Sequence, residues 1–411
     1  MNTLLNNCKM ASKELLKLSN DERNLCLEKI SKALLDNIDY ILENNKIDVS
    51  KAKENGISSV MVDRLTLNEN KIKNIAESCI DVMHLPNYIG ETIEELKPKS
   101  TIKIKKVRVP FGVICVIFES RPNVAVDISA LTIKTANACV LKGGKEAINT
   151  NKALVKIMRD AIKDIVNPNV ITLIESTDRK ATDELITKKE YIDLLVPRGS
   201  KRLIDYISQN CKVPFIETGA GNCNLYVDRD SDIDMALKII VNAKHQRPSV
   251  CNAIENIVID KPIASIILPK IKETFDNLNP KILIRGDKEC QKYIECDLAT
   301  EEDFYTEYND YICAIKCVDG IDEAIDFINI HSTKHSEAII TNDKSKAEKF
   351  FNEIDSACVY HNASTRFTDG GEFGFGAEIG IATTKLHSRG PMGLREITTH
   401  KYLIEGNGEI R

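Results

Sequence analysis

The sequence lacks the features of membrane-spanning and secreted proteins. Its 411 residues contain no run of about 18 consecutive apolar residues, the length that a transmembrane helix requires. The N-terminal segment MNTLLNNCKMASKELLKLSNDER is polar in every short window and has no apolar core of the kind found in a secretory signal. We therefore expect a cytoplasmic protein that has no membrane partner.

No long block of Lys and Arg is present. The 56 Lys and Arg residues are balanced by 61 Asp and Glu, which gives a net charge of −5 and no field that would gather nucleic-acid phosphates. With 28% charged and 43% hydrophobic residues, the composition is that of a globular protein. At roughly 150 residues per domain, the chain is expected to form two or three domains, and nucleic acid is not an expected partner.

Neither a disulfide framework nor a metal-binding motif is evident. The 13 cysteines are scattered, odd in number and never spaced as CxxC, so they are expected to be reduced thiols. His331 and His335 are four residues apart, but no Glu follows the first and no further His or Cys ligand lies nearby. The sequence therefore predicts no metal site.

What the sequence does contain is a helical N-terminal region followed by strand and helix patterns in alternation. Ser19 and Glu22 form a capping box, and apolar residues then recur at helical spacing; a second helix is expected at about 70–82. Residues 101–109 (TIKIKKVRV) alternate like a half-exposed strand. The C-terminal segment THKYLIEGNGEIR is another strand candidate.

Two series of β-rich runs occur between these terminal regions. The first series alternates with helical segments such as 149–162 and comprises residues 113–118, 138–141, 170–174, 192–196 and 225–227. The second comprises residues 257–259, 282–284, 312–315, 338–340 and 357–360. This order is typical of parallel sheets with crossover helices, so we predict an α/β protein with two such domains.

One cysteine lies in a setting that suits a nucleophile. In NAKHQRPSVCNA (242–253), Cys251 follows a proline-containing loop, precedes an apolar run, and has Lys244, His245 and Arg247 nearby. Cations stabilise a thiolate, which is the nucleophilic form of cysteine. The context alone also fits a structural loop cysteine, and both interpretations stay open at this point.

Two other segments place polar residues after buried strands. FESRPNVAVD (118–127) offers Arg121, which could hold a phosphate or carboxylate, and Asn123, which could donate to an oxyanion or merely cap a helix. LKGGKEA (141–147) places Lys142 and Lys145 around two glycines, as a phosphate cradle or an ordinary turn would. No GxGxxG fingerprint of a dinucleotide-binding βαβ unit is present.

Six segments together resemble the gamma-glutamyl phosphate reductase family of the aldehyde dehydrogenase superfamily. They occur in the family's order and are VPFGVICVIFESRPNVAVD (109–127), VPRGSKRLI (196–204), ETGAGNCNLYVD (217–228), NAKHQRPSVCNA, INIHSTKHSEAII (328–340) and HSRGPMGL (387–394). The resemblance implies an aldehyde dehydrogenase-like fold of two Rossmann-like α/β domains with a small bridging β-flap for oligomerisation. The implied domains are a cofactor-binding domain (1–98, 110–228 and 376–394), a catalytic domain (229–375) and the flap (99–109 and 395–411).

The resemblance also implies the activity, namely NADPH-dependent reduction of L-glutamate 5-phosphate to L-glutamate 5-semialdehyde in proline biosynthesis. Phosphate would be released and a thioester would form on Cys251, with Asn123 as the oxyanion-binding amide. The substrate-binding residues implied are Arg121, Arg247, His335 and Glu337, with no distinction between the arginine for the phosphate and the one for the α-carboxylate. A homo-oligomer is expected, and contact with glutamate 5-kinase is a further hypothesis.

A set of residues is implied to bind NADPH in a superfamily that does so without GxGxxG. Their expected contacts are the adenosine ribose for Lys142, the 2′-phosphate for Lys145, the pyrophosphate for Gly199 and Ser200, and the nicotinamide ribose for Glu307. Glu217 matches the superfamily's usual general base. This sequence departs from common family residues at Lys142, Asn224 and His245. Two alternatives remain, an NAD-dependent aldehyde dehydrogenase that requires Glu217 and a catalytically silent scaffold.

Overall fold

Two units make up the chain in the computed structural model, which describes residues 1–99 and 101–410. Unit 1 comprises Met1–Thr218, Gly374–Gly380 and Met392–Arg411, and unit 2 comprises Gly219–Phe373 and Ile381–Pro391. Each unit contains a parallel sheet covered by helices, as the alternating pattern predicts. Within the described ranges, no helix combines the length and the apolar character needed to cross a lipid bilayer.

The N-terminal region is helical. Its helices are α1 (Asn2–Leu15), α2 (Asn20–Asp36), α3 (Ile38–Glu54), α4 (Ser59–Leu65) and α5 (Glu69–His84). The predicted capping box starts α2, because Ser19 Oγ accepts from the Glu22 N–H at 3.2 Å and the Glu22 carboxylate accepts from the Ser19 N–H at 2.8 Å. The apolar face of α2 is buried at Leu27, Ile30 and Leu34, and the helix expected at 70–82 is confirmed as α5.

The sheet of unit 1 has four parallel strands in the order β5-β4-β3-β6. Its elements are β3 (Val113–Phe118), α6 (Asn123–Lys134), β4 (Ala138–Gly143), η1 (Lys145–Ala147), α7 (Ile148–Ile162), η2 (Pro168–Val170), β5 (Ile171–Leu173), α8 (Arg179–Leu185), β6 (Leu194–Arg198) and α9 (Lys201–Asn210). Every residue of β3 and β4 is buried, as expected for parallel strands covered on both faces. The arrangement sets the carboxyl ends of β3, β4 and β6 side by side.

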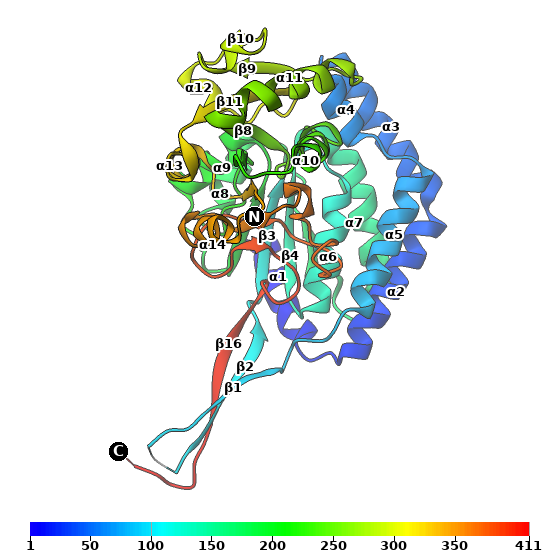
Figure 1. Cartoon of the computed structure of the whole chain (residues 1–411). Coiled ribbons are helices and arrows are strands. Elements are labelled where there is room, and N and C mark those ends of the chain that lie inside the picture. Colours follow the sequence, from blue (N-terminus) through cyan, green and yellow to red (C-terminus); the bar gives the residue numbers. More distant parts are fainter. Residues whose placement is uncertain (100, 411) are drawn as a thin grey trace. The chain divides into compact units, whose positions relative to one another are not determined.

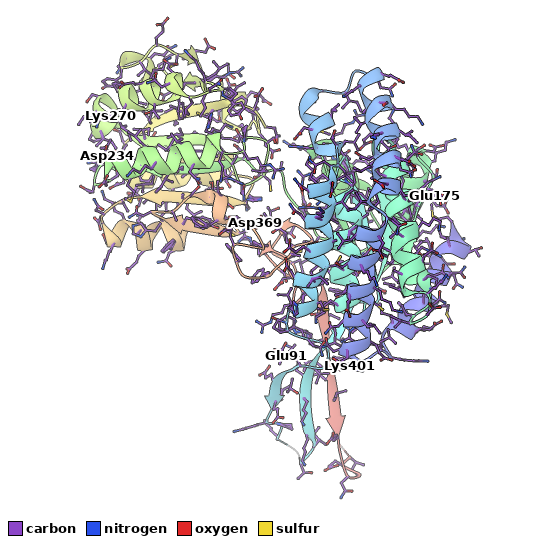
Figure 2. The ribbon with its side chains drawn as sticks, turned by 90° about the vertical axis from the view of Figure 1, so that its right-hand side faces the viewer. Glu91, Glu175, Asp234, Lys270, Asp369 and Lys401 are labelled. Carbon is purple, nitrogen blue, oxygen red and sulfur yellow. The ribbon has the colours of Figure 1, made fainter. Side chains whose placement is uncertain are left out.

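A three-stranded antiparallel flap extends from the helices of unit 1 (Figure 1). It consists of β1 (Thr92–Leu96), β2 (Lys103–Pro110) and β16 (Thr398–Glu405) in the order β1-β2-β16, and Figure 2 shows Glu91 and Lys401 near its base. The strands expected at 101–109 and at the C-terminus are β2 and β16. The flap also contains β1, which the predicted boundaries put in the cofactor domain, while residues 100 and 411 of the predicted flap lie outside the described residues.

The sheet of unit 2 has seven parallel strands in the order β10-β9-β11-β8-β7-β12-β13. Its elements are β7 (Cys223–Val227), α10 (Ile233–His245), β8 (Ile254–Asp260), α11 (Lys261–Asn277), β9 (Leu283–Gly286), η3 (Cys290–Lys292), β10 (Asp297–Leu298), α12 (Glu301–Phe304), β11 (Ile312–Val318), α13 (Gly320–His331), β12 (Ser336–Ile340), α14 (Lys344–Glu353), β13 (Cys358–His361) and η4 (Thr365–Phe367). One apolar cluster includes Ile240 of α10 and Ile267 of α11, and another includes Phe327 of α13 and Phe350 of α14.

The boundary between the units lies earlier than the one expected at residue 228. β7 is hydrogen-bonded between β8 and β12, so it belongs to the sheet of unit 2 and not to the cofactor domain to which it was assigned. Residues 381–391 also belong to unit 2 and not to the cofactor domain to which they were assigned. Within them, β14 (Ile381–Ala382) and β15 (Gly390–Pro391) pair with each other. A run of apolar residues predicts a strand but does not identify the sheet that the strand joins.

Candidate functional site

Cys251 lies at the amino edge of the seven-stranded sheet, on the loop between α10 and the central strand β8. The side chain is partly exposed, and its backbone carbonyl accepts from the Cys223 thiol at 3.2 Å. A Cβ on Gly221 would lie 1.5 Å from the Cys251 carbonyl oxygen, so only glycine fits there. The Gly221 N–H donates to Glu307 Oε1 at 2.8 Å. Gly221 thus brings together the predicted nucleophile and the carboxylate predicted to bind the nicotinamide ribose.

Two of the three cations predicted beside Cys251 have other partners. Lys244 is fully buried and its Nζ donates to Glu255 Oε2 at 2.5 Å. Burial raises the pKa of Glu255 to about 8, against the opposing effect of Lys244. The His245 ring lies 3.1 Å from the Pro280 carbonyl and packs against Tyr311. Arg247, the third member of the predicted set, is exposed, and its closeness to the sulfur stays a prediction.

Arg366 is a cation that the sequence argument missed. It comes from η4, and its guanidinium donates through Nη1 to Asn252 Oδ1 and through Nε to Gln246 Oε1, the latter at 3.3 Å. These two acceptors lie at either end of the segment that carries Arg247 and Cys251. The only sequence signal is an arginine in the polar segment NASTRFTDGG, and nothing in that segment indicates proximity to Cys251.

His335 and Glu337 lie where β12 begins, at the same edge of the sheet, and both are fully buried. His335 Nδ1 is 2.8 Å from Ser336 Oγ and 3.7 Å from the Cys223 sulfur. Glu337 Oε2 accepts from the backbone N–H and the side-chain Nδ2 of Asn224, at 2.6 and 2.9 Å. These contacts brace the strands beneath the Cys251 loop. A direct role toward substrate stays a prediction for both residues.

The Glu337 carboxyl is held by further donors. Its Oε1 accepts from Ser332 Oγ at 2.5 Å and from Ser356 Oγ at 3.3 Å. Burial nevertheless raises its pKa to about 8, although the hydrogen bonds from Ser332 and Asn224 act in the opposite direction. The group therefore retains a proton at pH values where an exposed Glu has lost it.

Asn123 is the first residue of α6 in unit 1 and follows Pro122. Its Nδ2 donates to Asp127 Oδ2 at 2.9 Å, one helical turn later, and Ser78 Oγ donates to the other oxygen of the same carboxylate at 3.3 Å. Burial raises the pKa of Asp127, while the hydrogen bond from Asn123 lowers it. Asp127 fixes which end of the Asn123 amide presents N–H groups. The spacing of four residues was visible in the sequence, but no role was assigned to Asp127.

Arg121 precedes this turn and is partly buried. Its backbone carbonyl accepts from the Val124 N–H at 3.1 Å, which helps to start α6. The predicted catalytic residues Asn123 and Cys251 therefore belong to different units.

The cofactor residues predicted in unit 1 cluster at the carboxyl edge of its sheet. Lys142 is the last residue but one of β4 and has 6% of its surface exposed; its ammonium donates to the Gly143 carbonyl at 3.1 Å, and burial lowers its pKa. Lys145 follows on the exposed start of η1. Gly199 and Ser200 follow β6, and Ser200 is the N-cap of α9. Ligands of parallel α/β sheets usually bind at this edge.

A carboxylate already occupies the turn between β6 and α9. Glu119 Oε2 accepts from the Ser200 N–H at 2.8 Å, and a Cβ on Gly199 would lie 2.6 Å from the same oxygen. An N–H at a helix N-terminus that holds a carboxylate can hold a phosphate in its place. Together with Lys142 and Lys145, this arrangement fits a nucleotide with a pyrophosphate and a further anionic group.

Glu217 lies near the end of unit 1 and is partly buried. Burial, and secondarily the negative charge of Asp205, raise its pKa. A carboxyl with a raised pKa can exchange protons nearer to neutral pH than an ordinary Glu can. The group is therefore chemically suited to proton transfer.

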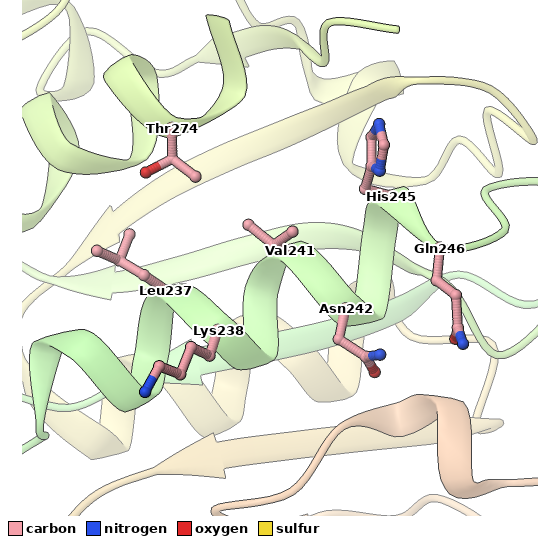
Figure 3. A pocket seen from close by; sticks show the side chains of 7 residues that line it. All are labelled: Leu237, Lys238, Val241, Asn242, His245, Gln246 and Thr274. Atoms are coloured by element: carbon pink, nitrogen blue, oxygen red, sulfur yellow. The ribbon is translucent and has the colours of Figure 1, made fainter. Parts of the chain in front are cut away.

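A surface hollow of about 480 Å³ lies beside α10 and α11 (Figure 3). Its lining residues are Leu237, Lys238, Val241, Asn242, His245, Gln246 and Thr274. Neither Cys251 nor any of the residues predicted to bind substrate or cofactor lines it, so we assign no chemistry to it. Across residues 1–99 and 101–410, no group of three or more His, Cys, Asp and Glu side chains could hold a metal ion.

Comparison with known proteins gives matches along the whole chain. A profile of the aldehyde dehydrogenase family matches residues 1–285. The gamma-glutamyl phosphate reductase of Dictyoglomus turgidum is 49% identical over 409 residues, which cover 99% of this chain and 98% of the relative. That of Petrotoga mobilis is 50% identical and covers 99% of both chains.

A solved structure gives the same result for the fold. The crystal structure of a gamma-glutamyl phosphate reductase from Thermotoga maritima superposes with a TM-score of 0.96 and 43% identity, covering 100% of this chain and 99% of that one. The aldehyde dehydrogenase-like fold expected from the motifs is therefore confirmed. The chain belongs to the aldehyde dehydrogenase family and, within it, to the gamma-glutamyl phosphate reductases.

Proposed function

We propose that this chain catalyses the NADPH-dependent reduction of L-glutamate 5-phosphate to L-glutamate 5-semialdehyde and phosphate, a step of proline biosynthesis. The observation that carries the proposal is the identity of about half of all residues, over the full length, to relatives named for this reaction. The close packing of the Cys251 carbonyl on Gly221, whose N–H donates to Glu307, supports the same conclusion from the geometry.

Cys251 is the proposed nucleophile. Its sulfur forms a bond to the acyl carbon of the substrate, and the bond from that carbon to the phosphate oxygen breaks, so the electron pair leaves with the phosphate. The product on the enzyme is a thioester. The sulfur is regenerated as a thiolate when the acyl group departs as the aldehyde. The close packing of the Cys251 carbonyl on Gly221 supports this role, because it fixes the loop that presents the sulfur.

Asn123 is the proposed side-chain donor to the oxyanion that forms during acyl transfer. The Nδ2 group carries two N–H bonds, and the one donated to Asp127 orients the amide and leaves the second for substrate. Glu217 is proposed to orient groups in the site and not to activate water. Phosphate is a good leaving group and no hydrolysis occurs, so the reaction does not need a strong base.

Membership of the aldehyde dehydrogenase family implies a nicotinamide cofactor. We propose that this cofactor is NADPH, which when bound supplies the hydride for reduction. Lys142 and Lys145 are proposed to hold its adenosine ribose and 2′-phosphate, Gly199 and Ser200 its pyrophosphate, and Glu307 its nicotinamide ribose. The positive charge of Lys145 beyond β4 supports the preference for a 2′-phosphate.

The proposal includes a homo-oligomer that assembles through the flap. β1 and β16 are the outer strands of the flap, and β16 exposes Tyr402, Leu403 and Ile404. Edge strands with exposed apolar side chains are suited to pairing with another chain. Deletion of the exposed part of β16 should lower the mass measured by sedimentation; an unchanged mass would rule out assembly through the flap.

A coupled assay tests the proposed activity. Glutamate 5-kinase, glutamate and ATP generate the acyl phosphate in place, and the decrease in NADPH absorbance is followed with wild-type protein and with Cys251→Ala. We expect oxidation of NADPH only with the wild type. In the reverse direction, oxidation of glutamate 5-semialdehyde should require phosphate. Phosphate-independent formation of the acid would instead indicate a hydrolysing aldehyde dehydrogenase, and no NADPH binding would indicate a silent scaffold.

A further inference from the structure

The 3₁₀ helix η4 is fastened to the loop that carries Cys251. Thr365 Oγ1 donates to the Asn252 carbonyl at 2.7 Å. In return, Asn252 Nδ2 donates to the carbonyls of Arg366 and Thr368, at 3.3 and 2.9 Å. Thr365, Thr368 and Asn252 are all buried. The backbone of Arg366 is therefore fixed relative to the nucleophile, although 115 positions separate them in the sequence (366 minus 251).

The side chain of Arg366 follows the same loop. Its Nη1 contacts Asn252 Oδ1 directly after Cys251, and its Nε donates to Gln246 Oε1 directly before Arg247. A guanidinium has five N–H groups in one plane, and these two contacts use two of them. The group therefore spans the segment that begins at Arg247 and ends at Cys251.

The positive charges of Arg247 and Arg366 influence each other beside the Cys251 loop. Burial, followed by the positive charge of Arg247, lowers the pKa of Arg366, while Cys251 and Asp369 act in the opposite direction. Among the described residues, no carboxylate lies within ion-pair distance of either guanidinium. The Asp369 carboxylate instead accepts from the Gly371 N–H at 2.9 Å. Two neighbouring cations repel each other, and a bound anion would relieve that repulsion.

We propose that Arg247 and Arg366 form a two-guanidinium site that binds the phosphate group of the acyl phosphate beside Cys251. This inference rests on the proposed function and assigns one of the two anionic groups of the substrate. A phosphate monoester-like group carries up to two negative charges and matches two forked guanidinium donors, whereas a carboxylate carries one. Arg247 thereby receives the phosphate and not the α-carboxylate, and Arg366 becomes a substrate-binding residue.

The site also assists the chemical step. When the sulfur bonds to the acyl carbon, the bond from carbon to the phosphate oxygen breaks and its electron pair stays on the phosphate. The leaving phosphate thus gains negative charge and takes up a proton from solvent as it is released. Two guanidinium groups stabilise that added charge more than they stabilise the bound substrate, which lowers the barrier to acyl transfer.

Alkylation of Cys251 with reagents of different charge tests the site without turnover. The rates of modification by anionic iodoacetate and by neutral iodoacetamide are compared by peptide mass spectrometry. In wild-type protein, inorganic phosphate should slow the modification of Cys251 by iodoacetate more than the modification by iodoacetamide. The ratio of the iodoacetate rate to the iodoacetamide rate should fall by about tenfold in Arg366→Gln and in Arg247→Gln, because each variant loses a charged donor. It should fall by less in Arg366→Lys. A purely structural role for Arg366 would change both rates by the same factor.

Lys270→Gln is the matched control, since it removes one exposed positive charge from α11 of the same unit. Figure 2 labels Lys270 and also Asp369, which lies on the segment after η4. The rate ratio should be unchanged in this variant. Arg247 is exposed, so Arg247→Gln should fold even if Arg366→Gln does not. An unchanged ratio in folded Arg247→Gln and Arg366→Lys overturns the proposal.

A kinetic experiment separates this proposal from the proposed function. In the phosphate-dependent oxidation of glutamate 5-semialdehyde, Arg366→Lys and Arg247→Gln should raise the KM for phosphate and leave the KM for NADP⁺ unchanged. If wild-type protein turns over and neither variant changes the KM for phosphate, the anion site is wrong and the function stands. If no turnover occurs but the alkylation ratios behave as expected, the anion site stands and the function is wrong.

Discussion

The two units handle charge in opposite ways around their candidate sites. In unit 1, the Ser200 N–H at the carboxyl edge of the sheet is already bonded to the partly exposed Glu119 carboxylate, so a ligand must replace an internal contact. In unit 2, the charged pair Lys244 and Glu255 beneath the Cys251 loop is buried, and among the residues that the structure describes no carboxylate lies within ion-pair distance of the Arg247 and Arg366 guanidinium groups. Under the proposed function, this difference predicts an exchangeable cofactor site in unit 1 and a rigid, preorganised nucleophile site in unit 2.

The largest effect should come from the buried pair Lys244 and Glu255, which joins the end of α10 to the start of β8 on either side of the Cys251 loop. Removing one partner leaves a buried polar group without its ion-pair and hydrogen-bond partner, so Lys244→Met or Glu255→Leu should lower the free energy of unfolding by about 3–5 kcal/mol. The double variant should recover most of that loss. Urea titration measures the effect, and single variants within the error of wild type would contradict a rigid platform in unit 2.

In unit 1, the corresponding effect should appear in rate and not in stability. Asn123→Ala should lower kcat by about 10²–10³, the usual effect of losing one oxyanion donor. Because Asn123 is partly exposed, the free energy of unfolding should change little. Asp127→Asn, which keeps the Asn123 side chain and removes the carboxylate that orients it, should reduce kcat less. A parental kcat in Asn123→Ala would disprove the assignment.

Loss of the proton from Glu337 should make unit 2 less stable as the pH rises. Its pKa is raised from 4.5 to about 8 on folding, so the folded protein binds more protons than the unfolded chain between these values. Stability from this group is therefore full below pH 4.5 and is lost as the pH rises toward 8. Glu337→Gln should reduce the slope of unfolding free energy against pH by at most about 1.4 kcal/mol per unit.

Urea titrations from pH 5 to 8 provide this measurement. The pKa of Glu255 is raised to about 8 as well, so part of the slope of unfolding free energy against pH should persist in Glu337→Gln. Identical slopes in the variant and the wild type would show that Glu337 is ionised in the folded protein.

Part of this organisation was predictable from the sequence. The apolar run 113–118 corresponds to β3, and the capping box at Ser19 starts α2. By contrast, β1 has the sequence TIEEL and is exposed throughout, so only its pairing with β2 reveals it. Local patterns report periodicity and caps, whereas the partner of a strand depends on the whole sheet.

The same limit applies to the candidate site. The motif around Cys251 predicts a nucleophile, which stays a prediction, and it also suggested that Lys244 lies beside the sulfur, whereas Lys244 is buried against Glu255. Arg366 was missed because it reaches the loop through tertiary contacts with Asn252 and Gln246. Residue type predicts the chemistry that a side chain can perform, and only the fold determines which residues the side chain contacts.

The smallest expected effect concerns the exchangeable contact in unit 1. Glu119→Gln keeps an acceptor for the Ser200 N–H but removes the negative charge, so the variant should bind NADPH more tightly, by about threefold to tenfold. Stability should be unchanged. Fluorescence titration of NADPH measures the affinity, with Glu175→Gln as a control that removes an exposed carboxylate elsewhere in unit 1. Equal affinities in wild type and Glu119→Gln would show that the contact does not compete with the cofactor.

Transfer of the glutamyl group to one sulfur is the central claim, and mass spectrometry of the enzyme tests it most directly. Protein is mixed with kinase, glutamate and ATP in the absence of NADPH, then quenched in acid and digested. We predict that one glutamyl group is attached to the peptide containing Cys251 and that adding NADPH before the quench removes it. An adduct on another residue, or no adduct in protein that turns over normally, would contradict the account.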